Sequence, residues 1–144
     1  MKVYLATDHA GFELKERVRK YLTELHLDVI DCGAYEFDKE DDYPDFIEKA
    51  AKAVSKSPKD RAIIFGGSGQ GEAMVANRQK NVRAAVYYGG PEEIVKLSRE
   101  HNDANILSIG ARFADSHKTL SLISDWLELP FSGEARHKRR IAKF

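Results

Sequence analysis

The chain has 144 residues, of which 42% are hydrophobic and 32% charged, and its formal net charge is zero. This length and composition are typical of one soluble globular domain and unlike those of a disordered chain. No apolar run approaches the roughly 18 residues that a membrane span requires. We expect no secretory leader, and Cys32, as the single cysteine, excludes an internal disulfide. A cytoplasmic location is therefore the expectation.

The charges are unevenly distributed along the chain. Residues 130–144 contain five basic residues and one acidic residue, which gives this tail a net charge of +4 and leaves −4 for the rest. A basic tail can be a nucleic-acid arm, a solvated end or an anion-binding element. Because the remainder is acidic and has no stripe of alternating aromatic and basic residues, we do not expect nucleic-acid binding.

Strand and helix patterns alternate about five times along the chain. Such alternation predicts right-handed crossovers and an α/β fold: one domain over residues 1–144, with a five-stranded parallel Rossmann-like sheet in a three-layer α/β/α sandwich. Within the helix expected at 92–101, Ile94, Leu97 and Ser98 are predicted to face inward. In chain order, strands are expected at 3–7, 29–32, 62–65, 82–88 and 106–109, and helices at 14–25, 44–54, 72–79, 92–101 and 116–129.

The segment 66–72 is the most informative part of the chain. It follows the predicted strand 62–65, holds four glycines within six residues and ends at Glu72. Glycines let the backbone approach a ligand and point its N–H groups inward, which suits a phosphate or a developing oxyanion. A carboxylate does not hold an anion, but it can take a proton from a molecule held there. The alternative is a flexible connection between strand and helix.

Two nucleotide-binding motifs do not fit this segment. A Walker loop requires a lysine followed by Ser or Thr after its last glycine, and here Glu72-Ala73 follows. The dinucleotide-binding fingerprint requires a glycine at position 72. ATP and NAD are therefore disfavoured.

Further candidates follow from where ligands bind in open α/β sheets, which is outside the carboxyl ends of the strands. Asp8 and His9 follow the first predicted strand, and Arg112 follows the fifth. His101 and Asn102 lie just before the fifth strand. Taken singly, Asp8 could be a helix N-cap, Asn102 a helix C-cap and Arg112 a surface charge. Their convergence on one edge with the glycine loop favours a functional site.

No metal site is expected, because the five histidines show no two-ligand spacing. Cys32 ends an edge-like strand and is interpreted as a small buried residue. The four carboxylates of the loop 38–42 are interpreted as solvated, with Tyr43 at the end of that loop close enough to reach a ligand.

Over nearly its whole length the chain resembles the family of ribose-5-phosphate isomerase B and the galactose-6-phosphate isomerase subunits. The motifs that carry the resemblance are Asp8-His9-Ala10-Gly11, Asp31-Cys32-Gly33, Asp42-Tyr43-Pro44, Gly66-Gly67-Ser68-Gly69-Gln70-Gly71-Glu72, Ala76-Asn77, Arg99-Glu100-His101-Asn102, Gly110-Ala111-Arg112 and Arg136-His137-Lys138-Arg139-Arg140.

The resemblance implies an aldose–ketose isomerase without a cofactor. In one branch of the family the base is a cysteine just before the glycine loop, where this chain has Gly66. In the other branch it is the glutamate after the loop, here Glu72, so the chain resembles the glutamate branch. The implied reaction interconverts ribose 5-phosphate and ribulose 5-phosphate: His101 and Asp8 open the sugar ring, and Glu72 then moves a proton through an enediolate.

The resemblance also implies a homodimer, or a tetramer of such dimers, in which the segment 130–144 completes the neighbour's site. His9, Arg112, Arg136, His137 and Arg140 would hold the phosphate. The open alternatives are a hexose-6-phosphate isomerase of the galactose-6-phosphate type and a non-catalytic sugar-phosphate-binding module. The full set of residues implied to bind the substrate is His9, Tyr43, Gly67, Ser68, Gly69, Gln70, Gly71, Asn102, Arg112, Arg136, His137 and Arg140.

Overall fold

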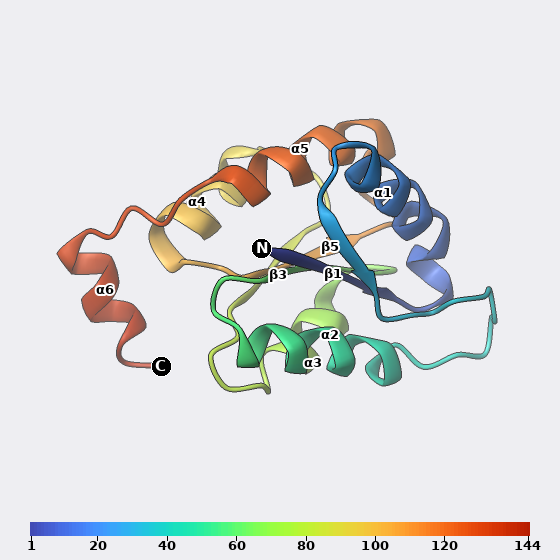
Figure 1. Cartoon of the computed structure of the whole chain (residues 1–144), viewed down its shortest axis with the longest axis horizontal. Coiled ribbons are helices and arrows are strands. Elements are labelled where there is room, and N and C mark those ends of the chain that lie inside the picture. The colour runs from blue at the N-terminus through green and yellow to red at the C-terminus, as the bar shows by residue number, and fades with distance from the viewer.

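Five parallel strands form one sheet in the computed structural model, which describes residues 1–144 (Figure 1). The spatial order is β2-β1-β3-β5-β4, and every neighbouring pair is parallel. The α/β class and the five-stranded parallel sheet are thus confirmed. The strands are β1 (Lys2–Thr7), β2 (Asp28–Asp31), β3 (Arg61–Gly66), β4 (Ala84–Tyr87) and β5 (Ile106–Gly110).

Helices cover both faces of the sheet, which confirms the three-layer arrangement (Figure 1). No helix is long and apolar enough to span a lipid bilayer. One face carries α1 (Phe12–Glu24), α4 (Glu93–Asn102) and α5 (Ser116–Glu128); the other carries α2 (Pro44–Lys56) and α3 (Gln70–Ala76); a 3₁₀ turn (His9–Gly11) joins β1 to α1, and α6 (Ala135–Ile141) ends the chain.

The core consists of two apolar clusters, one on each face of the sheet. Successive side chains of β3 point to opposite faces, so Ile63 and Phe65 join the cluster that contains Trp126, whereas Ile64 joins the cluster that contains Ile47. All five side chains are fully buried. Burial on both faces explains why the central strands are near-continuous hydrophobic runs.

The helix after the glycine loop differs from the predicted range 72–79. It begins two residues earlier, at Gln70, and ends at Ala76. The side chain of Asn77 donates to the carbonyl of Ala84 at 3.1 Å and accepts from its N–H at 2.8 Å. These bonds turn the chain into β4, which explains why both the helix end and the strand start differ from the prediction.

The predicted inward face of α4 is partly wrong. Ile94 is 57% exposed and Leu97 half-buried, whereas Ser98 and Arg99 are buried. Ser98 Oγ accepts from Nε1 of Trp126 at 3.1 Å, and the Arg99 guanidinium donates to two backbone carbonyls. The helix thus turns an arginine inward, because the buried charge is satisfied by hydrogen bonds that a hydrophobicity pattern does not reveal.

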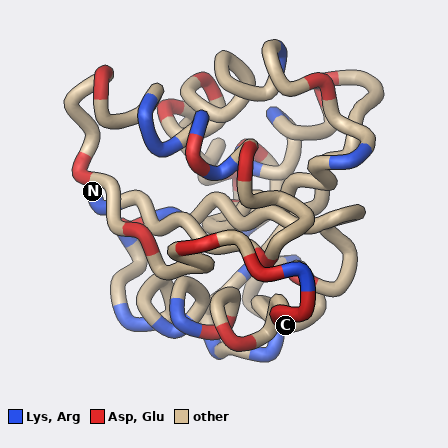
Figure 2. The backbone as a smooth tube through the Cα atoms, turned by 90° about the vertical axis from the view of Figure 1, so that its right-hand side faces the viewer, with Lys and Arg blue, Asp and Glu red and all other residues tan.

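The strands β1, β3 and β5 end side by side at one edge of the sheet. Thr7 pairs with Phe65, and Gly66 pairs with Gly110. The segments that follow these strands are therefore brought together. Figure 2 faces this side of the molecule and shows basic and acidic positions intermixed along the backbone.

The C-terminus of α4 lies at the opposite edge, which corrects the expectation that His101 shares an edge with the glycine loop. Arg83, which directly precedes β4, donates from Nε to the carbonyl of Asn102 at 3.1 Å. α6 packs beside this end, where the Ser132 N–H donates to the carbonyl of Glu100 (Figure 1). A crossover helix runs antiparallel to the strands that it joins, so its last residues lie where the next strand begins.

Candidate active site

Of the two predicted helix caps, the structure confirms Asp8 and corrects Asn102. Asp8 is buried, and its carboxylate accepts from the N–H of Ala10 at 2.9 Å, which caps the 3₁₀ turn. Asn102 is the last residue of α4, and Asp103 takes the left-handed conformation that ends the helix, with φ of 48°. The cap does not exclude a catalytic role for Asp8, because it fixes the carboxylate at the carboxyl edge of the sheet.

The glycine loop presents unpaired backbone donors at the same edge. Gly69 has a φ of 77°, and its carbonyl accepts from Ser108 Oγ at 2.7 Å, which holds the loop against β5. The N–H groups of Gly67, Ser68, Gly69 and Gly71 donate to no group of the chain. Several fixed donors in a tight loop can stabilise an oxyanion or a phosphate oxygen.

Glu72 lies beside this loop with its side chain directed at Gly66. The residue is 4% exposed, and a Cβ at position 66 would overlap the Glu72 carboxyl group. Burial raises the pKa of Glu72, the negative charge of Asp8 adds to the rise, and its own backbone N–H opposes it. A carboxylate with a raised pKa is a better proton acceptor, so burial prevails over the positive character of the loop.

Cys32 is buried, as predicted, and burial is the largest cause of its raised thiol pKa. A raised pKa disfavours the thiolate, which is the nucleophilic and basic form of cysteine. The structure thus offers no activated thiol at this position.

Two further predicted residues close the sides of the loop. A Cβ at Gly71 would lie 2.6 Å from the Tyr43 hydroxyl, and a Cβ at Gly67 would lie 3.4 Å from the Arg112 guanidinium. The backbone of Arg112 also donates to the carbonyl of Gly67. Tyr43 and Arg112 therefore flank the donors of the loop, and glycine is required where the tyrosine ring packs.

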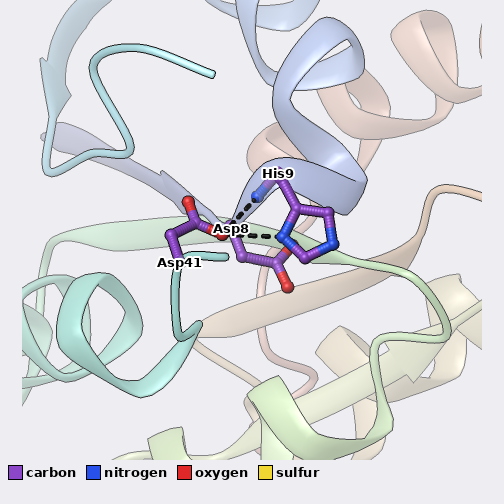
Figure 3. A group of neighbouring side chains, drawn as sticks. All are labelled: Asp8, His9 and Asp41. Atoms are coloured by element: carbon purple, nitrogen blue, oxygen red, sulfur yellow. Dashed lines mark hydrogen bonds and ion pairs between the residues drawn. The ribbon is translucent and has the colours of Figure 1, made fainter. Parts of the chain in front are cut away.

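His9 is held by a residue that the sequence interpretation placed in solvent. Asp41 Oδ1 accepts from the His9 backbone N–H at 3.0 Å and lies 2.7 Å from His9 Nδ1 (Figure 3). The prediction of a solvated loop is therefore wrong for Asp41, because the loop folds back over the end of β1. No sequence spacing indicates a contact between residues 32 positions apart.

Asp8, His9 and Asp41 also offer one potential metal-ligand atom each within 4.8 Å of one another. The histidine spacing did not indicate this grouping. Asp8 caps the turn through the Ala10 N–H, and His9 Nδ1 is bonded to Asp41. These side chains are thus already engaged in hydrogen bonds within the protein.

The remaining predicted residues form a second group beside α4 and α6. The ring centroids of His101 and His137 lie 4.2 Å apart, and Ser132 Oγ lies 2.9 Å from His137 Nδ1. Burial, followed by the charge of His101, lowers the pKa of His137. Arg136 bonds to Glu134 at 2.8 Å. No hydrogen bond or ion pair of the chain joins this group to Glu72, so the predicted site residues form two separate groups at opposite edges of the sheet.

Comparison with known proteins places this geometry in one family. A model of the ribose/galactose isomerase family matches residues 3–144. Ribose-5-phosphate isomerase B of Mycolicibacterium paratuberculosis is 40% identical over 141 residues, which cover 98% of this chain and 87% of that protein. The crystal structure of ribose-5-phosphate isomerase B from Mycoplasma genitalium with bound ribulose-5-phosphate is 36% identical, with a TM-score of 0.93 over 99% of this chain and 92% of that one. The enzyme from Clostridium thermocellum is 38% identical, with a TM-score of 0.92 over 99% of this chain and 94% of that one. The chain belongs to the ribose/galactose isomerase family.

Proposed function

We propose that the chain interconverts ribose 5-phosphate and ribulose 5-phosphate, with Glu72 as the base. The observation that carries this proposal is a buried carboxyl group of raised pKa beside a loop of unpaired N–H donors. A base and an oxyanion binder in contact are what proton transfer next to a carbonyl requires. The relatives named above support the five-carbon substrate, and no feature of the site favours a six-carbon sugar or a non-catalytic role.

The proton transfer uses one carboxylate twice. Glu72 removes the proton from C2 of the open aldose; the C–H electron pair forms the C1–C2 double bond, and O1 takes the negative charge. The N–H groups of Gly67 to Gly71 stabilise that charge. The hydroxyl proton on O2 then passes to O1, and Glu72 returns its proton to C1, which leaves the ketone at C2.

Ring opening precedes this step and needs an acid at the ring oxygen. We assign that role to His101, with Asp8 accepting the proton of the anomeric hydroxyl and Asn102 positioning a sugar hydroxyl. Because His101 lies at the opposite edge of the sheet from Glu72, the acid and the base of one site cannot come from the same chain in this conformation.

This separation supports a homodimer in which each site is composite. One subunit supplies Asp8, His9, Tyr43, Glu72, Arg112 and the glycine loop. The other supplies His101, Asn102 and the basic helix α6, with Arg136, His137 and Arg140 toward the phosphate. The contact between the His101 and His137 rings supports the proposal that one subunit supplies both residues to the same site. Arginine suits phosphate because its planar fork donates two parallel hydrogen bonds.

The reaction is tested by an isomerase assay on ribose 5-phosphate with a chelator present and, in parallel, on six-carbon sugar phosphates. We expect turnover of ribose 5-phosphate that the chelator does not reduce, and slower turnover of the six-carbon sugars. Glu72→Gln keeps the shape of the side chain and should lower turnover about 10²- to 10⁴-fold with little change in substrate binding. An inactive wild-type protein that binds ribose 5-phosphate tightly would contradict the proposal.

A further inference from the structure

The contact between Asp41 and His9 has the form of a partly buried ion pair, with the His9 side chain 28% exposed. The Asp41 side chain is 9% exposed, and its Oδ1 receives both hydrogen bonds from His9. The neighbouring Glu40 side chain is 80% exposed. Asp41 is thus turned inward from a segment whose other carboxylates face solvent.

The second oxygen of Asp41 strengthens this interpretation. Oδ2 is buried and has no hydrogen-bond partner, and Figure 3 shows it directed away from the His9 ring. A buried carboxylate is costly unless a positive charge compensates it. His9 is the group that bonds to Asp41, so the ring compensates the carboxylate when it is an imidazolium.

Within its own chain, the charged groups around His9 are Asp41, Asp8 and Arg112. In the proposed dimer, Arg136, His137 and Arg140 of the other subunit approach the same phosphate. The hydrogen bond to Asp41 is the largest influence and raises the His9 pKa above its ordinary value of 6.5. Burial and the charge of Arg112 lower it, while Asp8 raises it. The balance is upward, so His9 keeps its proton to higher pH than an ordinary histidine does.

The free nitrogen of His9 is directed by the same contact. Nδ1 is engaged by Asp41, which leaves Nε2 as the ring nitrogen free to donate to a ligand. The Phe37 ring, itself largely exposed, lies edge-on to the imidazole with ring centroids 6.4 Å apart. The contact with Asp41 therefore sets which nitrogen the His9 ring presents.

We infer that Asp41 is a positioning residue for the sugar-phosphate site, which holds His9 as an imidazolium with Nε2–H free for the phosphate. The inference rests on the proposed function and on the phosphate-binding role that the family resemblance implies for His9. Its physical basis is that His9 should be positively charged at the pH at which the substrate phosphate is a dianion. The second pKa of a phosphate monoester is about 6, so the substrate is a dianion at neutral pH, where an ordinary histidine is mostly neutral. Asp41 keeps the cation and the dianion present together.

Asp41→Asn is the discriminating variant, because its amide oxygen still accepts both His9 hydrogen bonds while the charge is lost. Glu40→Gln is the matched control: it removes the same charge one residue away. The measurement is KM and kcat for ribose 5-phosphate from pH 6 to pH 8, each divided by the wild-type value so that titration of the substrate cancels.

For Asp41→Asn we expect KM to be closest to the wild-type value at pH 6, where His9 of the variant carries the most positive charge. At pH 8 we expect KM to be about fivefold higher, the difference between a charge-assisted and a neutral hydrogen bond to phosphate. The change in kcat should stay within about twofold, since the contact is equal in the ground and transition states. Glu40→Gln should match wild type throughout, and adding Asp41→Asn to His9→Gln should have no further effect.

A second readout needs no turnover. Ring ¹⁵N titration of His9 in the substrate-free protein, assigned with His9→Gln, should give a pKa above 6.5 in wild type that falls in Asp41→Asn. Inorganic phosphate should perturb this signal at lower concentration in wild type than in the variant at pH 7.5. A loss of KM that is equal at pH 6 and pH 8, an unchanged His9 titration, or equal phosphate responses would each overturn the inference. A wild-type protein that shows both ring signatures but does not convert ribose 5-phosphate would retain Asp41 as a positioning residue for phosphate and refute the proposed reaction.

Discussion

Mixing inactive variants tests whether the group around Glu72 and the group around His101 of one chain belong to different active sites. In a hybrid of a Glu72→Gln subunit with a His101→Asn subunit, one composite site carries both defects and the other carries neither. Random exchange makes half of the dimers hybrids, each with one intact site of two, so the mixture should recover about a quarter of wild-type activity. If each parent is reduced about 10²-fold or more, the recovery exceeds the background at least about 25-fold.

The design includes an internal control that follows from the contact between α4 and α6. The double variant Arg136→Ala/Arg140→Ala should also complement Glu72→Gln, because in the proposed dimer one subunit supplies both arginines together with His101. It should not complement His101→Asn, since each hybrid site then receives one defect. Each charged phosphate contact that is lost should weaken binding by about 1.5–3 kcal/mol, or roughly tenfold to over a hundredfold.

The assay is steady-state isomerase activity after subunit exchange, with hybrid dimers verified by differently tagged chains and native mass spectrometry. Absence of recovery in a verified hybrid of Glu72→Gln and His101→Asn would show that each chain completes its own site. Recovery in the His101→Asn and tail-variant mixture would refute the grouping of α6 with His101.

Three further outcomes follow from the site and its supports. Gly66→Ala places a methyl group where the Glu72 carboxyl lies, and turnover should fall about 10²-fold or more while the melting temperature changes little, as measured by assay and calorimetry. Because the base must be deprotonated, the raised pKa of Glu72 places the acid limb of the pH profile of kcat/KM above the ordinary glutamate pKa of about 4.3. Glu72→Asp should move this limb, whereas Cys32→Ser should not. Lys15 is fully buried and donates to both Asp31 carboxylate oxygens at 2.7–2.8 Å. Lys15→Met should therefore lower the free energy of unfolding, measured by urea titration, by about 2–3 kcal/mol. An unchanged urea midpoint would contradict the importance of this pair.

The strands and most helices could be predicted because their signals are local. The central strands are apolar runs that end at glycines, as at Gly66 and Gly110, and parallel pairing follows from the intervening helices. The inward face of α4 could not be predicted, because the buried Arg99 is satisfied by bonds to the carbonyls of Ala104 and of Leu129, the latter distant in sequence. The helix α6 was not expected, since a short, strongly basic segment lacks an apolar face long enough to indicate one.

The candidate site likewise has parts that local sequence predicts and parts that depend on contacts between distant segments. Glu72 and the glycine loop are contiguous in sequence, so their proximity could be predicted. The contact of Asp41 with His9 arises only when the loop before α2 folds over the end of β1. The place of His101 depends on the direction in which α4 crosses the sheet, which the rule for strand ends does not contain.

The steric relation between Gly66 and Glu72 also bears on how the two branches of this family can be connected by mutation. The Glu72 carboxyl group occupies the space that any side chain at position 66 would need. A side chain at position 66 therefore displaces this carboxyl group, which is the flexible end of Glu72, from its present place. In a lineage that gains a thiol at position 66, we expect the Glu72 carboxylate to move away from the loop, so that the two bases do not occupy the site together. We therefore expect the exchange of one base for the other to involve both positions.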